Sequence, residues 1–183
     1  MEKDVKWCDY FADNRRYADI INGIACEGQQ VVSQDDLREL DARSRKKFRD
    51  VVRKVARGVN FAIIGIENQD EVDYELPVRI MEYDVAGYRK QINAIKKSIR
   101  EKRETVKPGE YMYGFKKDSQ LYPVTTIVLY AGVEPWDGAE RLHELIDFTD
   151  IPDTLKELVQ DYKIKVVDIR RLTDTSMFKT DVR

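Results

Sequence analysis

Cysteine and histidine are scarce in this chain of 183 residues. The two cysteines, Cys8 and Cys26, are too few for a disulfide framework and lack the CxxC spacing of a zinc site. The single histidine, His143, cannot form a cluster of metal ligands, and we expect it to have a structural role. These shortages argue against a disulfide-stapled or zinc-dependent fold and favour a reducing compartment.

Long apolar runs are also missing, since no segment approaches the ~20 residues needed to cross a bilayer. The amino terminus carries Glu2, Lys3, Asp4 and Lys6 where a secretory signal would be apolar. We therefore expect a cytoplasmic protein without a membrane partner.

The net charge is only −2, but the charges are distributed unevenly. Sixteen of the 32 basic residues occupy two short segments, 43–57 and 89–107. The first segment contains Arg43, Arg45, Lys46, Lys47, Arg49, Arg53, Lys54 and Arg57. Such a run suits contacts with the phosphates of a nucleic acid, although charge runs also occur on solvated faces.

Hydrophobic periodicity predicts an α/β domain in which strands and helices alternate. We expect a helix over 13–25 capped by Asp13, strands at 50–56, 61–66, 124–130 and 164–169, and a long helix after Pro77. A helix is the alternative for 48–56. The buried seam of the long helix is predicted to consist of Val78, Met81, Val85, Tyr88, Ile92, Ile95 and Ile99, with Arg79, Tyr83 and Arg89 facing outward.

Two carboxylates fall opposite each other if Gly58 and Val59 form a two-residue hairpin loop. Position i then pairs with position 117 minus i, so Asp50 faces Glu67, and Gln69 shares the face of Glu67. Opposed Cβ atoms lie roughly 4.5 to 5.5 Å apart, close enough for one hard divalent cation to be shared. The alternative is that Asp50 caps a turn and Glu67 pairs with Arg49 or Arg53, and Asp41 is the rival for the first metal carboxylate.

Several motifs along the chain resemble a known family. They are YADIIN at 17–22, RDV at 49–51, GIENQ at 65–69, PVRIMEYD at 77–84, LYPVTTIVLY at 121–130, PW at 135–136 and LHEL at 142–145. Together they resemble the recombination-promoting nuclease (Rpn)/putative transposase family, a branch of the PD-(D/E)XK nuclease superfamily. The resemblance covers nearly the whole chain.

This resemblance implies a restriction-endonuclease-like core, in which a central mixed β-sheet is flanked by helices, in a single domain over 1–183 that could continue beyond Arg183. It assigns catalysis to Asp50, Glu67 and Gln69, with Mg²⁺ or Mn²⁺ held by Asp50, Glu67 and the main-chain carbonyl of Asn68. Gln69 stands where the superfamily signature has lysine. Asp19 is the candidate for the additional acid that related nucleases carry on the first helix.

The function implied is that of a metal-dependent DNA endonuclease connected with recombination, mobile elements or defence against foreign DNA. The residues expected to contact DNA are Arg45, Lys46, Lys47, Arg49, Arg53, Arg79 and Tyr83. A homodimer would suit double-strand cuts. The alternative is an inactive module on a nuclease fold that binds nucleic acid or protein, because fold alone does not establish activity.

Overall fold

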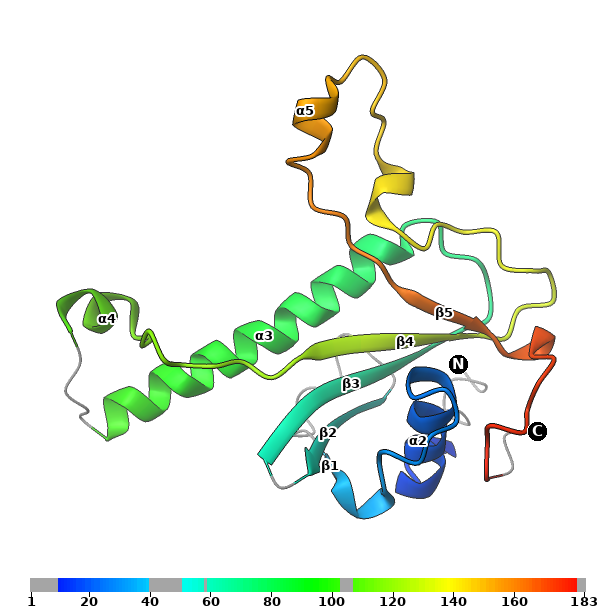
Figure 1. Ribbon diagram of the computed structural model, residues 1–183, viewed down its shortest axis with the longest axis horizontal. Coiled ribbons are helices and arrows are strands. Elements are labelled where there is room, and N and C mark those ends of the chain that lie inside the picture. Colours follow the sequence, from blue (N-terminus) through cyan, green and yellow to red (C-terminus); the bar gives the residue numbers. More distant parts are fainter. Residues whose placement is uncertain (1–9, 40–50, 58, 103–106, 181–183) are drawn as a thin grey trace.

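The computed structural model of the chain describes residues 10–39, 51–57, 59–102 and 107–180. Its centre is a five-stranded mixed sheet in the order β1-β2-β3-β4-β5, flanked by helices (Figure 1). The strands are β1 (Leu37–Glu39), β2 (Val51–Arg57), β3 (Val59–Gln69), β4 (Val124–Tyr130) and β5 (Lys165–Asp168). The pairs β1/β2 and β2/β3 are antiparallel, whereas β3/β4 and β4/β5 are parallel. This is the predicted α/β class, and it is consistent with a restriction-endonuclease-like core.

Four α-helices accompany this sheet within the described part of the chain. They are α2 (Asn14–Ile20), which continues as a π-helical turn at Ile21–Ala25, α3 (Leu76–Glu101), α4 (Pro108–Tyr113) and α5 (Asp153–Lys156). Short 3₁₀ turns lie at Gln34–Asp36, Leu142–Leu145 and Ile169–Arg171. The predicted cap of α2 is present, because the Asp13 carboxylate accepts a hydrogen bond from Arg15 N at 2.8 Å.

The hairpin of β2 and β3 has the predicted register over most of its length. Val51 pairs with Ile66, and the pairing continues to Val55 opposite Ala62, so each pair of residue numbers sums to 117. The strand interpretation of this segment is therefore confirmed for β2. A register shift follows Val55 and brings Arg57 opposite Val59, which means that Val59 belongs to β3 and not to the predicted two-residue loop. Gly58 lies outside the described residues.

One face of the sheet packs against α2 and holds the larger apolar core. Side chains of Phe11, Tyr17, Ile20 and Ile21 meet Ile64, Ile66, Ile127 and Leu129 of β3 and β4. The hydroxyl of Tyr17 also donates to the carbonyl oxygen of Ile64 at 2.6 Å, so the helix is joined to the strand by a buried hydrogen bond. Because strand side chains alternate, Val128, between Ile127 and Leu129, faces the other side and packs with Leu76 and Ile80.

The other face is covered by α3, whose buried side differs from the predicted seam. Leu76, Ile80 and Asp84 are buried, whereas Val85 of the predicted seam is 54% exposed. Gly87 faces Val124, and a methyl group at this glycine would lie only 2.8 Å from Val124 Cγ1. The helix also extends beyond the sheet, so its second half has no sheet to cover (Figure 1). Apolar residues there follow helical spacing without becoming a buried seam.

Despite its 26 residues, α3 is too strongly charged to be a membrane span. Within the described ranges, no helix has both the length and the apolar character needed to cross a membrane.

Candidate functional site

Glu67 and Gln69 lie on the face of β3 that is covered by α3. Arg79, in the first turns of α3, reaches both residues: its Nη2 lies 2.8 Å from Gln69 Oε1 and 3.5 Å from Glu67 Oε1. A helix residue can contact both only if positions 67 and 69 point the same way, as strand alternation predicts. The predicted convergence of Glu67 and Gln69 therefore agrees with the geometry.

The same guanidinium is held from its other side by Asp73. Arg79 Nη1 lies 2.6 Å from Asp73 Oδ2, while Asp73 Oδ1 accepts a hydrogen bond from Glu75 N at 3.0 Å. The Asp73 carboxylate thus binds the backbone at the start of α3 with one oxygen and orients the Arg79 guanidinium with the other. All three ionic side chains are largely buried, with exposed fractions of 30% for Arg79, 15% for Asp73 and 12% for Glu67.

Asp73 is a residue of this site that the sequence pattern does not single out. A usable signal exists, because an aspartate a few residues before a proline at the start of a helix often bonds the free backbone N–H groups there. Helical periodicity also predicts that Arg79 lies on the outward face of its helix. Its burial among acidic and amide groups corrects that assignment.

The site lies where the parallel strands β3 and β4 end. Gln69 opposite Tyr130 is the last pair of the ladder, and Ala131 N donates to the carbonyl oxygen of Gln69 at 2.8 Å. In open α/β sheets, ligands bind beyond the carboxyl ends of the strands, especially where the chain connections change direction. The candidate site therefore occupies the edge of the sheet at which chemistry is usual.

The loop after β4 is anchored beside this edge. Tyr130 Oη donates to the carbonyl oxygen of Glu134 at 2.8 Å, and its ring meets the Trp136 ring edge-on with centroids 5.1 Å apart. Tyr74 Oη lies 3.3 Å from Asp137 Oδ1, and the negative charge of Asp137 raises the pKa of that phenol. These contacts join the loops that follow β3 and β4, and Trp136 packs against the ring of Tyr130.

Several predicted site residues lie outside the described part of the chain: Asp50, Asp41, Arg45, Lys46, Lys47 and Arg49. The described register ends with Val51 opposite Ile66, one position short of the predicted pair of Asp50 and Glu67. The backbone of Asn68 lies in the parallel ladder opposite Leu129, and its side chain is outside the description.

Asp19 is buried and belongs to another part of the molecule. Its carboxylate accepts hydrogen bonds from Lys179 N at 2.8 Å, from Thr180 N at 2.6 Å and from Thr180 Oγ1 at 2.7 Å. It lies on α2, which packs on the face of the sheet opposite α3. The structure therefore does not bring Asp19 to Glu67, and the observed role of Asp19 is to anchor the segment around Thr180.

Arg53 does not have the exposure that a phosphate contact requires. Its side chain is 2% exposed, and its Nε donates to Asn14 Oδ1 at 3.2 Å. The guanidinium also lies over the ring of Tyr17, with Cζ 5.5 Å from the ring centroid. The predicted DNA contact at Arg53 is therefore wrong, because the alternation of β2 turns this residue toward α2. Tyr83 is half-buried and packs against the cluster of Leu76 and Ile80.

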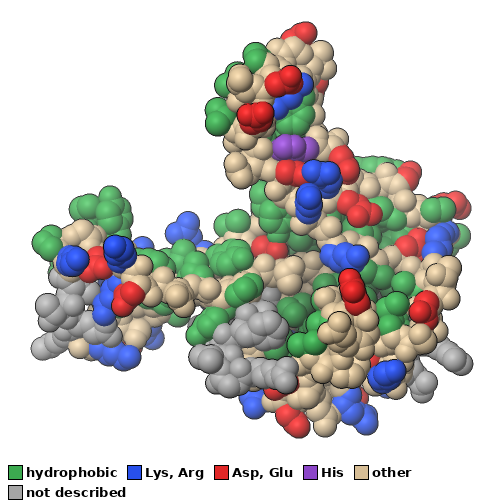
Figure 2. Space-filling model, in the orientation of Figure 1, with side chains coloured by type: hydrophobic (Ala, Val, Ile, Leu, Met, Phe, Trp, Pro, Cys, Tyr) green, Lys and Arg blue, Asp and Glu red, His purple; other side chains and the backbone are tan. Residues whose placement is uncertain are grey.

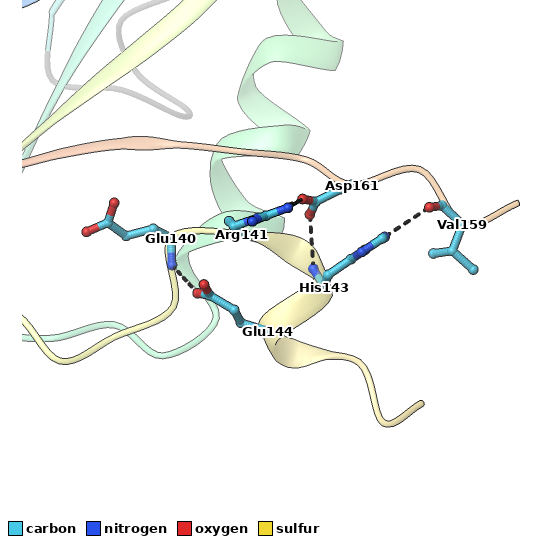
Figure 3. A network of polar contacts seen from close by, with 6 residues as sticks. All are labelled: Glu140, Arg141, His143, Glu144, Val159 and Asp161. Carbon is cyan, nitrogen blue, oxygen red and sulfur yellow. Dashed lines mark hydrogen bonds and ion pairs between the residues drawn. The ribbon is translucent and has the colours of Figure 1, made fainter. Parts of the chain in front are cut away.

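His143 lies in a separate polar network at the base of the segment 142–160 (Figure 3). Its Nε2 is 2.9 Å from the carbonyl oxygen of Val159, and its backbone N donates to Asp161 Oδ1 at 3.2 Å. Asp161 also forms an ion pair with Arg141 at 2.6 Å. These contacts link residues 141–143 at the start of the segment to residues 159–161 at its end. The histidine therefore has the structural role that we expect.

The chain matches the sequence model of a protein family described as "Putative transposase, YhgA-like" over residues 40–182. The chain belongs to this family. Membership in the YhgA-like family indicates a transposase-like or nuclease-like function. No curated protein and no solved structure matches the chain.

The YhgA-like match includes Glu67, Gln69, Asp73 and Arg79 but leaves out Asp19. Of these, Glu67 offers a carboxylate and Gln69 offers an amide oxygen. Such oxygen ligands suit Mg²⁺ or Mn²⁺ better than they suit zinc. Within 10–39, 51–57, 59–102 and 107–180, no three His, Cys, Asp or Glu side chains gather closely enough to form a metal site by themselves. The donor chemistry of Glu67 and Gln69 fits a hard cation.

Proposed function

We propose that this YhgA-like protein is a metal-dependent DNA endonuclease that hydrolyses phosphodiester bonds. The observation that carries the proposal is the meeting of Glu67 and Gln69 with Arg79 at the carboxyl ends of β3 and β4. A carboxylate, an amide and a guanidinium at one strand end suit the handling of water and phosphate oxygens. The family description, which names transposases, is compatible with DNA as the substrate.

Asp50, Glu67 and the main-chain carbonyl of Asn68 would hold Mg²⁺ or Mn²⁺. The hairpin register supports the pairing of the two carboxylates. The paired residue numbers of β2 and β3 sum to 117 up to Val51 and Ile66, and Asp50 with Glu67 would be the next pair in this register. When bound, the ion lowers the pKa of a coordinated water and offsets charge on the scissile phosphate. The remaining tasks are positioning and charge compensation by side chains of the protein.

Gln69 and Arg79 together do the work of the lysine that the superfamily signature has at position 69. Arg79 donates to Gln69 Oε1, so the amide group is held in one orientation and its NH₂ can donate to water or to a phosphate oxygen. The guanidinium brings permanent positive charge to within 3.5 Å of Glu67. A neutral glutamine can therefore serve here, since the positive charge comes from a neighbouring helix.

The test is cleavage of supercoiled plasmid in Mg²⁺ or Mn²⁺ by the wild-type chain and by Asp50→Asn, Glu67→Gln and the matched control Glu71→Gln. Glu71 is exposed on the connector beyond β3, so its substitution makes the same chemical change away from the site. We expect nicking or linearisation in the wild type and in the control, and loss of both in the two site variants and in EDTA. Cleavage that persists in Asp50→Asn and Glu67→Gln would overturn the proposal.

A second candidate function is a nucleic-acid-binding module that does not cleave. It is favoured by one observation, the replacement of the signature lysine by Gln69. DNA binding by a folded wild-type chain that is indifferent to EDTA and to Asp50→Asn, without cleavage in either metal, would select this candidate. Gel shifts with the same plasmid measure it in parallel.

A further inference from the structure

Two segments project from the body of the molecule in different directions (Figure 1). We call residues 142–160, which include α5, the acidic arm. We call residues 96–102 and 107–117, which include the end of α3 and α4, the basic arm. Neither arm belongs to the sheet or to the candidate site.

The arms carry opposite charges. The acidic arm has five acidic residues and one lysine, which gives a net charge of −4. The described residues of the basic arm have seven cations and two acids, which gives a net charge of +5. Figure 2 shows acidic side chains near the end of the upper projection and basic side chains on the left one. The charges of the two arms are thus complementary.

Each arm also exposes apolar side chains close together. On the acidic arm, Leu158 is 72% exposed, and Leu145, Ile151, Leu155 and Val159 are exposed as well. On the basic arm, Tyr111 is 80% exposed and is followed by the exposed Met112 and Tyr113. Grouped exposed apolar residues with charged surroundings are typical of protein interaction surfaces.

We propose that the acidic arm docks on the basic arm of a second copy of this chain. In a twofold pair the same contact forms twice, since each copy offers one arm of each kind. The charges identify the partner as a second copy of the chain. A partner for the acidic arm must be basic and a partner for the basic arm must be acidic, and one copy of the chain supplies both. DNA would match the basic arm alone and would leave the leucines of the acidic arm exposed.

The structure supports an intermolecular contact over an internal one. Ion pairs within the arms include Lys156 with Asp153 at 3.2 Å and Lys97 with Glu101 at 3.6 Å, each between neighbours on one helix. Glu110 instead accepts hydrogen bonds from the backbone N of Lys107 and Lys117, which holds α4 in shape. Each arm is thus held by contacts within itself, and the two arms project in different directions within one copy (Figure 1).

Charge reversal tests the proposal. One variant carries Asp153→Lys, Glu157→Lys and Gln160→Lys, and the other carries Arg100→Glu, Lys102→Glu and Lys117→Glu, all at exposed positions. Within either variant both arms then have the same sign, so we expect monomers by light scattering and a dimer Kd raised roughly tenfold or more. An equimolar mixture restores opposite signs at both contacts, and we expect it to form heterodimers.

The matched control is Glu71→Lys with Glu82→Lys and Glu134→Lys, three exposed positions outside both arms. We expect this control to dimerise like the wild type, and we expect added salt to weaken the wild-type dimer. A monomeric wild type, dimers that persist in both reversed variants, or a mixture that stays monomeric would each overturn the proposal. So would a basic-arm variant that loses only DNA binding, since the arm would then be a nucleic-acid surface. These measurements need neither metal nor cleavage, so their failure leaves the proposed nuclease untouched.

Discussion

The two faces of the sheet are built differently. The face covered by α2 is closed by apolar side chains such as Tyr17, Ile20 and Ile66, all at most 1% exposed. The face covered by α3 has a smaller apolar cluster and carries the contacts of the candidate site: Arg79 contacts Glu67, and beside them Thr126 and Tyr162 donate to Asp84. One face therefore supplies most of the apolar packing, and the other holds the polar groups of the candidate site.

This difference shows how one strand can contribute both to the apolar core and to the candidate site. Ile64 and Ile66 of β3 face the apolar side, while Glu67 and Gln69 face α3 and meet Arg79. Because side chains alternate, the apolar packing that holds β3 in place does not compete with the polar groups on its other side. Substitutions on the two faces should consequently have different signatures.

The largest expected effect is a loss of stability on the α2 face. Ile66→Ala removes a completely buried side chain, and we expect the free energy of unfolding to fall by about 2 to 5 kcal/mol. Urea unfolding measures the change. The control is Val85→Ala on α3, where the side chain is half exposed and a change within about 0.5 kcal/mol is expected. Equal losses in the two variants would contradict the comparison.

A smaller loss is expected from the buried polar cluster under α3. Asp84→Ala leaves the hydroxyls of Thr126 and Tyr162 without their acceptor, which should lower the free energy of unfolding by about 2 kcal/mol. Glu82→Ala, an exposed acid on the same helix, is the control and should be nearly neutral. If Asp84→Ala were as stable as the control, the carboxylate would not be holding the helix on the sheet.

The Arg79 cluster should affect cleavage more than stability. Arg79→Met removes the guanidinium that orients Gln69, so we expect kcat of plasmid cleavage to fall about 100-fold with little change in DNA affinity. Arg79→Lys should restore part of the activity, because one ammonium cannot reach Glu67, Gln69 and Asp73 together. Arg89→Met, exposed on the same helix, is the control. A loss confined to DNA affinity would mean that Arg79 binds phosphate directly.

The smallest expected effect lies at the end of the basic arm, away from both faces. Hydrogen bonds from the backbone N of Lys117 and Lys107 hold the pKa of Glu110 below its usual value of 4.5. A depressed folded pKa means that the contribution of Glu110 is present above 4.5 and is lost as the pH falls through the folded value. We expect the amide protection of Lys117, measured by NMR, to decrease over that acidic range. Glu110→Gln should abolish this pH dependence, and its persistence would assign it to another group.

The elements that the sequence predicts best are those whose pattern is local. β4 has the predicted bounds 124–130, and the hairpin of β2 and β3 has the predicted register up to Val55. Continuous apolar runs and a nearby glycine specify such elements without knowledge of distant residues. Glu67 and Gln69 share a face because side chains alternate along a strand, so the part of the candidate site on β3 was predictable from the sequence.

Misjudged residues are those whose surroundings come from far along the chain. The predicted seam of α3 includes Val85, yet Leu76, Ile80 and Asp84 are buried, because the helix turns a different side to the sheet. Similarly, Arg53 lies in a basic run that suggests exposure, but it is buried against Asn14 of α2. The local sequence pattern predicts neither which side of α3 faces the sheet nor where α2 packs.

By itself, the sequence determined the α/β class, the β2–β3 register and the face that Glu67 and Gln69 share, because strand periodicity and short-range pairing depend on neighbouring residues. Only the tertiary structure decided that Arg79 joins those two residues to Asp73, and that Asp19 anchors Thr180 instead of approaching Glu67. Such contacts depend on how a helix is placed over a sheet, and that placement results from packing between segments that no local pattern records.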